Sequence, residues 1–191
     1  MAKCFDVVGY IEPCNAVRQK YTGRALLITG NGEGVAIEPT FAINGITITA
    51  IGNSSSFIDA SITKLSISIN AENPFGVTIQ GNTDSGRVMY TKTIPVSIPA
   101  TRDGKAEEFI MGLQSGFNKH NSVIVLETFG DANENDIFGV YSPIRIDPAS
   151  VTRSEYENGG AWQFNLVCEE PVPNVICTMK GLSDAIEQAG S

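Results

Sequence analysis

Histidine is almost absent from this chain of 191 residues, which contains only His120. One histidine cannot supply a two-histidine metal site, and histidine is the side chain whose unperturbed pKa best suits proton transfer near neutral pH. No uninterrupted run of about 18 apolar residues occurs, so the sequence predicts no membrane-spanning helix. The first residues show no basic stretch followed by an apolar one, and we expect no secretory signal. These absences argue against catalysis and against a membrane protein.

Basic residues are also scarce. The 13 Lys and Arg residues face 21 Asp and Glu residues, which gives a net charge of −8 at pH 7. Sequence-general binding to DNA or to anionic lipid depends on cations that neutralise phosphates, so this balance argues against both. Hydrophobic residues make up 42% of the chain, enough for one globular core. We expect a single domain over residues 1–191.

The four cysteines do not form a recognisable metal site. Cys4 and Cys14 lie near the start, Cys168 and Cys177 lie near the end, and neither pair has the two-residue spacing of a zinc knuckle. Nothing in the sequence indicates an oxidising compartment, which a disulfide framework needs. We therefore predict reduced, structural thiols, with a disulfide or a metal site as the alternatives.

Two loops resemble ligand sites but depart from the motifs of those sites. Residues 30–34 are rich in glycine but lack the lysine and the hydroxyl of a phosphate-binding loop, so they predict a hairpin turn. Residues 131–136 begin like a calcium loop, but Asp136 stands where glycine belongs and Ser142 where the bidentate glutamate belongs. A solvated loop is the better interpretation there. Asp59, Glu127 and Asp147 could contribute to a carboxylate pair for acid–base catalysis, but the sequence favours no pair among them. We expect no cofactor, no metal and no catalytic residue.

Alternation of apolar and polar residues is the dominant pattern and predicts β-strands. The alternating segments are residues 40–49, 61–70, 86–99, 122–129, 137–146 and 160–168, with shorter strands at 77–80 and 175–179 and an early hairpin from 23–30 and 35–37. Pro95 and Pro99 cannot donate a hydrogen bond to a neighbouring strand, so that half of the 86–99 strand should lie at a sheet edge. The polar stretch 147–160 predicts a long connection.

One helix is expected in mid-chain, over residues 104–119. Asp103 is a suitable N-cap, and Ala106, Ile110 and Leu113 follow the spacing of one apolar helical face. A short terminal helix is expected at 183–189. Strands, a helix and further strands in this order predict a mainly β protein, an antiparallel β-sandwich or barrel with one mid-chain α-helix packed against it.

In its order of elements the chain resembles the phage tail tube protein family. The shared features are an N-terminal arm (residues 1–22), a long β-hairpin around residues 61–98, the helix at 104–119, and a late aromatic strand that contains Trp162 and Phe164. The resemblance covers about two thirds of the chain. Residues 171–191 exceed the family pattern and are expected to form a C-terminal extension.

The resemblance implies a structural virion protein and no enzyme. It implies a homo-oligomeric ring, a hexamer by family pattern, that contacts other tail or neck proteins and lets genomic DNA pass through its channel without specific binding. The protein would be made in the host cytoplasm and reside in the virion. The side chains facing away from Leu65 and Ile67 would line the channel: Lys64, Ser66 and Ser68. Contacts between subunits are expected at Arg18, Lys20, Pro74 and Phe75.

Other functions fit the same composition. A collar ring or a capsid decoration protein would have similar construction. A ligand-binding β-sandwich, for example for carbohydrate, predicts aromatic residues grouped on loops, whereas the only tryptophan, Trp162, lies in a predicted core strand. An enzyme ranks third, because no nucleophile or acid–base spacing stands out.

Overall fold

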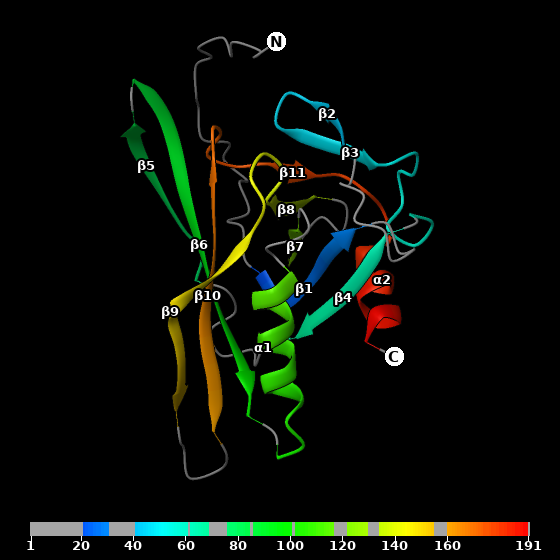
Figure 1. Ribbon diagram of the computed structural model, residues 1–191. Coiled ribbons are helices and arrows are strands. Elements are labelled where there is room, and N and C mark those ends of the chain that lie inside the picture. Colours follow the sequence, from blue (N-terminus) through cyan, green and yellow to red (C-terminus); the bar gives the residue numbers. More distant parts are fainter. Residues whose placement is uncertain are drawn as a thin grey trace.

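The structure, a computed structural model, describes residues 21–30, 41–60, 62–68, 76–84, 86–100, 102–116, 122–129, 134–154 and 160–190. It is mainly β, with two sheets and two helices in the described part, which confirms the predicted fold class (Figure 1). The elements in chain order are β1 (Tyr21–Gly30), β2 (Phe41–Asn44), β3 (Thr47–Ile51), β4 (Thr63–Ser68), β5 (Thr78–Asp84), β6 (Arg87–Pro99), α1 (Lys105–Gly116), β7 (Val123–Thr128), β8 (Asn135–Phe138), β9 (Arg145–Ser154), β10 (Ala161–Glu170), β11 (Ile176–Cys177) and α2 (Leu182–Ala189).

The strands form two open sheets and no closed barrel. The larger sheet has the order β2-β3-β11-β8-β7-β1-β4, and the smaller one has the order β5-β6-β10-β9. All recorded strand pairs are antiparallel except the short pair of β11 with β3. Every residue of β7 is buried, because this central strand is covered on both faces.

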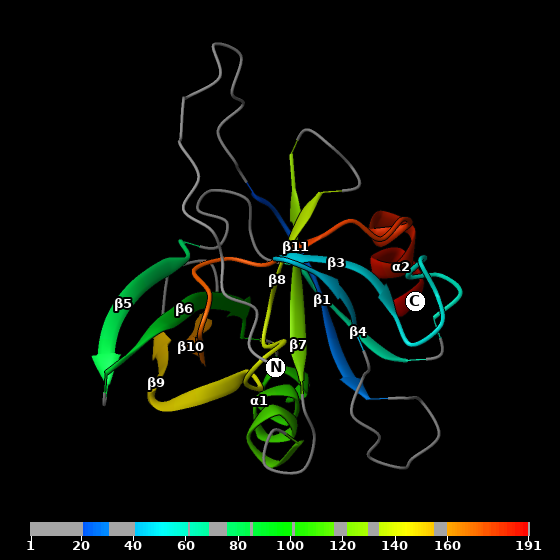
Figure 2. The same ribbon diagram turned by 90° about the horizontal axis from the view of Figure 1, so that it is seen from above.

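The two cores lie on opposite faces of the seven-stranded sheet. The first core fills the space between the two sheets and α1, and Leu27, Phe164 and Leu166 belong to it. The second lies under α2 and the segment that follows β3, and Leu26, Phe57 and Ile186 belong to it. Leu26 and Leu27 point to opposite cores because neighbouring residues of a strand face opposite ways. Figure 2 shows the resulting layers, with the four-stranded sheet and α2 on either side of the larger sheet.

The register of β6 and β10 confirms the predicted alternation. Phe164 pairs with Val96 and Leu166 with Ile94, and all four side chains are buried on the inner face. The ladder between β5 and β6 begins at Thr93, so Pro95 and Pro99 lie in the half of β6 that pairs with β10 alone. The two prolines thus occupy an edge, as expected.

Both predicted helices are present. Asp103 Oδ1 accepts a hydrogen bond from the backbone N–H of Lys105 at 3.2 Å, so it caps α1 as expected. Ile110 and Leu113 point into the first core. The predicted end of this helix, residues 117–119, lies outside the described residues. The terminal helix α2 buries Leu182, Ala185 and Ile186.

The long hairpin predicted over residues 61–98 is not formed. β4 pairs with β1 in the larger sheet, whereas β5 pairs with β6 in the smaller one. Alternation marks a strand but does not identify its partner, and here the partner of β4 is distant in sequence. The predicted early hairpin and its glycine-rich turn involve residues 31–40, which lie outside the described part.

The predicted connection over residues 147–160 is largely a strand. β9 runs from Arg145 to Ser154 and pairs with β10, with an irregular register opposite Gln163 and Asn165. Its sequence is polar because β9 is an edge strand with Ile146 as its only fully buried residue. The predicted strand 137–146 is divided between β8 and β9 by a bend that contains Gly139.

The chain ends differ in their roles. Of the expected N-terminal arm, Tyr21 and Thr22 begin β1, and residues 1–20 lie outside the described part. Within the expected C-terminal extension, β11 is an internal strand of the larger sheet, and Val175 and Met179 are fully buried in the second core. Residues 171–190 are therefore an integral part of the fold and not an appendage.

Candidate assembly surface

The β5–β6 hairpin extends beyond the body of the molecule (Figure 1). Residues 78–83 of β5 are all exposed, as are Arg87 and Val88 of β6. Ile79 and Val88 are 43% and 53% exposed and lie on the same face as the half-buried Tyr90. Residues 82–84 pair with residues 87–89 beyond the end of β10, so this tip is a two-stranded hairpin, which is only marginally stable on its own. We take this hairpin as the first part of the candidate assembly surface.

The free edge of β5 is the second part. Of the four strands that end the described sheets, three carry features that discourage pairing with another chain. β2 is only four residues long, β4 contains Lys64, and β9 contains Pro148. β9 is also bulged, and Ser150 Oγ accepts the Asn165 N–H at 2.8 Å in place of a ladder bond. The stretch 78–83 of β5 contains neither proline nor a charged residue.

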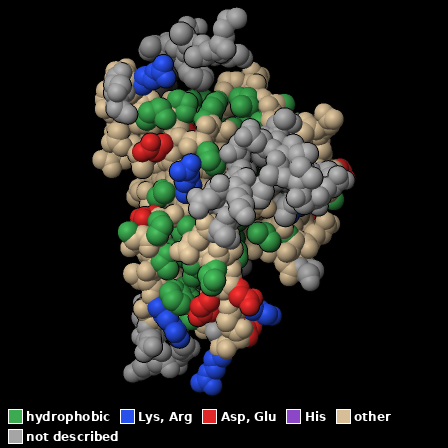
Figure 3. All heavy atoms as spheres, viewed as in Figure 1, with side chains coloured by type: hydrophobic (Ala, Val, Ile, Leu, Met, Phe, Trp, Pro, Cys, Tyr) green, Lys and Arg blue, Asp and Glu red, His purple; other side chains and the backbone are tan. Residues whose placement is uncertain are grey.

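The outer face of the four-stranded sheet is the third part. Its residues are exposed or half-buried, and most are small or uncharged polar side chains. They are Thr78, Gln80, Asn82, Met89, Thr91, Thr93, Pro95, Ser97, Asp147, Arg145, Thr152, Gln163, Asn165, Val167 and Glu169. Asn82 Nδ2 donates to Thr91 Oγ1 at 2.9 Å across the hairpin. Figure 3 shows the face viewed in Figure 1, where hydrophobic side chains lie among polar ones and among separate Lys, Arg, Asp and Glu side chains.

The predicted channel residues lie on a different, covered face. Ser66 is half-buried, and its hydroxyl lies close to Gly190 at the end of α2. A Cβ added to Gly190 would lie only 2.9 Å from Ser66 Oγ. Lys64 Nζ donates to the carbonyl of Ile58 at 3.2 Å, and burial lowers its pKa. Ser68 pairs with Arg24 of β1. α2 packs against β4, the strand that carries these residues. The assignment of Lys64, Ser66 and Ser68 to a channel wall stays a prediction.

The residues predicted to form subunit contacts, Arg18, Lys20, Pro74 and Phe75, all lie outside the described part of the chain.

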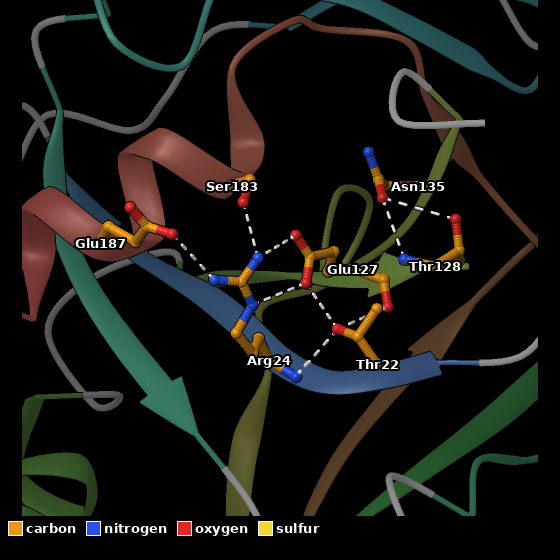
Figure 4. Close-up of polar contacts among 7 residues, drawn as sticks. All are labelled: Thr22, Arg24, Glu127, Thr128, Asn135, Ser183 and Glu187. Atoms are coloured by element: carbon orange, nitrogen blue, oxygen red, sulfur yellow. Dashed lines mark hydrogen bonds and ion pairs between the residues drawn. The ribbon is translucent and has the colours of Figure 1, made fainter. Parts of the chain in front are cut away.

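A polar cluster around Arg24 fixes α2 to the larger sheet (Figure 4). Arg24 forms two hydrogen bonds with Glu127, Nε to Oε2 at 2.8 Å and Nη2 to Oε1 at 2.7 Å. The same guanidinium donates to Ser183 Oγ at 2.6 Å and to Glu187 Oε1 at 3.3 Å, both on α2. Thr22 Oγ1 donates to Glu127 Oε2 at 2.5 Å. Burial alone would raise the pKa of Glu127, but the bonds from Arg24 and Thr22 outweigh it and lower that pKa.

A second polar group, an ion pair between Lys92 and Glu170, lies in the first core. Lys92 Nζ contacts Glu170 Oε2, and both side chains are 0% exposed. Glu170 Oε1 accepts the backbone N–H groups of Gly139 at 3.2 Å and Tyr141 at 3.1 Å. Lys92 Nζ also lies 5.3 Å from the centre of the Phe138 ring. Sequence reasoning missed this pair, although Lys92 falls on the same alternating phase as Tyr90 and Ile94.

The acidic run 131–136 is not the solvated loop that was expected, as far as it is described. Asn135 and Asp136 belong to β8 and are buried. Asp136 Oδ2 accepts from Tyr21 Oη at 2.5 Å, and its Oδ1 accepts from Asn174 Nδ2 at 2.9 Å. Burial first, and then Asp136, raise the pKa of Tyr21 above its ordinary value. These carboxylate oxygens link β8 to β1 and to the segment just before β11.

The described residues offer no cluster that could bind a metal ion. Cys168 and Cys177 are free, buried thiols, as predicted for these two. Burial raises their pKa values to about 12 and about 11. In the described parts of the chain, neither helix combines the length and hydrophobicity needed to span a bilayer.

No family model, curated protein or solved structure matches this chain, so its function must be argued from the surfaces above.

Proposed function

We propose that this chain is a structural subunit of a homo-oligomeric ring in a phage tail, of the tail tube or collar type, through which genomic DNA passes. The observation that carries the proposal is the β5–β6 hairpin, whose two-stranded tip lies beyond the end of β10 and whose β5 edge pairs with no other described strand. Such a hairpin gains stability when another chain covers it. The order of elements, with a mid-chain helix followed by an aromatic strand, adds the resemblance to tail tube proteins.

The open edge of β5 suits strand addition by a neighbouring copy. Unpaired backbone N–H and C=O groups provide the affinity in this mode of binding, and side chains provide the specificity. A contact between two different surfaces of identical subunits repeats around an axis and closes into a ring when the rotation permits. Ring formation would thereby remove the exposed edge that each subunit has alone.

The outer face of the four-stranded sheet suits the channel wall in this arrangement. Gln163, Asn165 and Ser97 have no charge that would hold a phosphate. The two carboxylates of this face, Asp147 and Glu169, outnumber its one cation, Arg145. The net charge of −8 also disfavours binding of the DNA phosphates. The proposed wall thus replaces the face of β4 that was expected from the sequence.

The test is the size of the purified chain in solution, measured by light scattering coupled to size-exclusion chromatography, with electron microscopy of the same fractions. We expect rings or stacked tubes with a central opening. A stable monomer at micromolar concentration would contradict the proposal and favour a ligand-binding β-sandwich. Compact closed oligomers without an opening would favour a capsid decoration protein.

A further inference from the structure

The buried pair Lys92 and Glu170 is out of place among its neighbours. The other inner-face residues of β6 and β10, such as Ile94 and Leu166, are apolar and buried. Apolar residues of similar volume usually stabilise a core as well as a buried ion pair does, because removing two charges from water is costly. Stability alone therefore does not account for an ammonium and a carboxylate at this place.

Neither member of the pair can react with a molecule from solution. Both side chains are 0% exposed. Lys92 pairs in register with Cys168, so Glu170, two residues further along β10, is its diagonal neighbour on the same face. The carboxyl group of Glu170 is thus the electrophile that the fold presents to the amine of Lys92.

We propose that Lys92 and Glu170 form an intramolecular isopeptide bond, a covalent cross-link between β6 and β10. In the first step, one proton passes from Nζ to Oε2 across their contact and leaves a neutral amine beside a neutral acid. Nζ then attacks Cδ of Glu170. The Nζ–Cδ bond forms, the Cδ–Oε2 bond breaks, and Oε2 leaves as water with two of the three ammonium protons. The third proton stays on the amide nitrogen, so charge and atoms balance.

Two features of the site assist this step. The N–H groups of Gly139 and Tyr141 both point at Oε1, at 3.2 and 3.1 Å, where negative charge develops in the tetrahedral intermediate. Two backbone donors arranged in this way form an oxyanion hole. The fold also holds amine and carboxyl together, which replaces a bimolecular encounter. Exclusion of water from the core hinders hydrolysis of the product.

The experiment is intact mass spectrometry of the denatured wild-type chain after purification in the folded state. We expect a mass lower than that of the sequence by one water. The Lys92→Arg variant keeps a cation but has no amine nucleophile, and it should have the full mass. The matched variant Lys64→Arg, at a half-buried lysine that donates to a backbone carbonyl, should retain the loss of water.

Tryptic digestion locates the bond. Trypsin does not cleave after an acylated lysine, so a branched peptide should join residues 88–102 to residues 154–180 in wild-type protein. A dehydrated Asp103-Gly104 sequence would also lose water, but it gives no branched peptide and persists in Lys92→Arg. Folded wild-type protein that has the full mass, or that is cleaved normally after Lys92, would overturn the proposal.

Discussion

At the scale of single residues, the cluster around Arg24 ties three elements together. Its guanidinium bonds Glu127 of β7 and two side chains of α2. We expect Arg24→Ala to lower the free energy of unfolding by about 2 kcal/mol, since it leaves the carboxylate of Glu127 without its charged partner in a largely buried position. Urea denaturation at pH 7 measures this loss.

The same cluster predicts a pH dependence with a definite sign. The pKa of Glu127 in the folded chain lies below its ordinary value of 4.5, so its ionised form is favoured by folding. The stabilisation that ionised Glu127 gives is complete above the pKa that Glu127 has in the unfolded chain. It is lost as the pH falls through the pKa that Glu127 has in the folded chain. The difference in unfolding free energy between wild type and Glu127→Gln should therefore be larger at pH 7 than at pH 3. An equal difference at both pH values would show that the charge of Glu127 does not matter.

Cys168 and Cys177 should be chemically inert while the chain is folded. The thiolate is the reactive form, and burial raises the pKa values of these thiols to about 12 and about 11. At pH 8 we expect alkylation of both residues only after denaturant is added. Peptide mass spectrometry reads each cysteine separately, so reaction at Cys4 or Cys14 does not interfere. Rapid labelling of Cys168 in buffer would contradict the buried position.

At the scale of elements, the bend between β8 and β9 depends on a glycine. Gly139 has a φ of 97°, and a Cβ added there would lie 2.6 Å from the carbonyl oxygen of Ser122. We expect Gly139→Ala to cost about 2 kcal/mol or more. Gly112 of α1 is the matched control, because a Cβ there meets no atom within 4 Å. Gly112→Ala should stabilise by about 0.5–1 kcal/mol, which thermal or urea denaturation can detect.

If the chain forms the proposed ring, the β5–β6 hairpin should control assembly without controlling folding. Ile79→Lys combined with Val88→Lys places two charges on its exposed apolar face. The unfolding free energy should change little, whereas a docked hairpin would have to bury both charges, and the oligomer should dissociate. Met111→Lys on α1, where the side chain is 66% exposed, is the control and should leave the oligomer intact. Intact rings in the double variant would exclude this face from the interface.

Elements with one strong local pattern could be predicted from the sequence, whereas their partners could not. β10 was identifiable because Phe164, Leu166 and Cys168 alternate on one buried face. β9 was missed because an edge strand with Pro148 and a bulge has the composition of a loop. The pairing of β4 with β1 and the covering of Ser66 by α2 depend on contacts distant in sequence, and no local pattern encodes them.

At the scale of the whole molecule, the position of α2 decides which polar face remains available. α2 packs on the side of the larger sheet that bears Ser66, and the four-stranded sheet covers the other side. The polar outer face of the four-stranded sheet belongs to neither core. If subunits form a channel, this face and the hairpin that extends it are, within the described residues, the surfaces best suited to line it.

If the chain forms the proposed channel, charge placed on that outer face should slow the passage of DNA. Ser97 and Gln163 are register partners, half-buried and exposed respectively. Ser97→Lys with Gln163→Lys adds two cations per subunit. In a stack of rings these cations would bind DNA phosphates along the whole channel. We expect virions with this variant to assemble normally and to eject DNA more slowly, with the delay reduced by added salt. Ser97→Gln with Gln163→Asn changes the same positions without charge and should eject at the wild-type rate. Dye binding to released DNA follows the time course, and an unchanged rate in the lysine variant would remove this face from the channel wall.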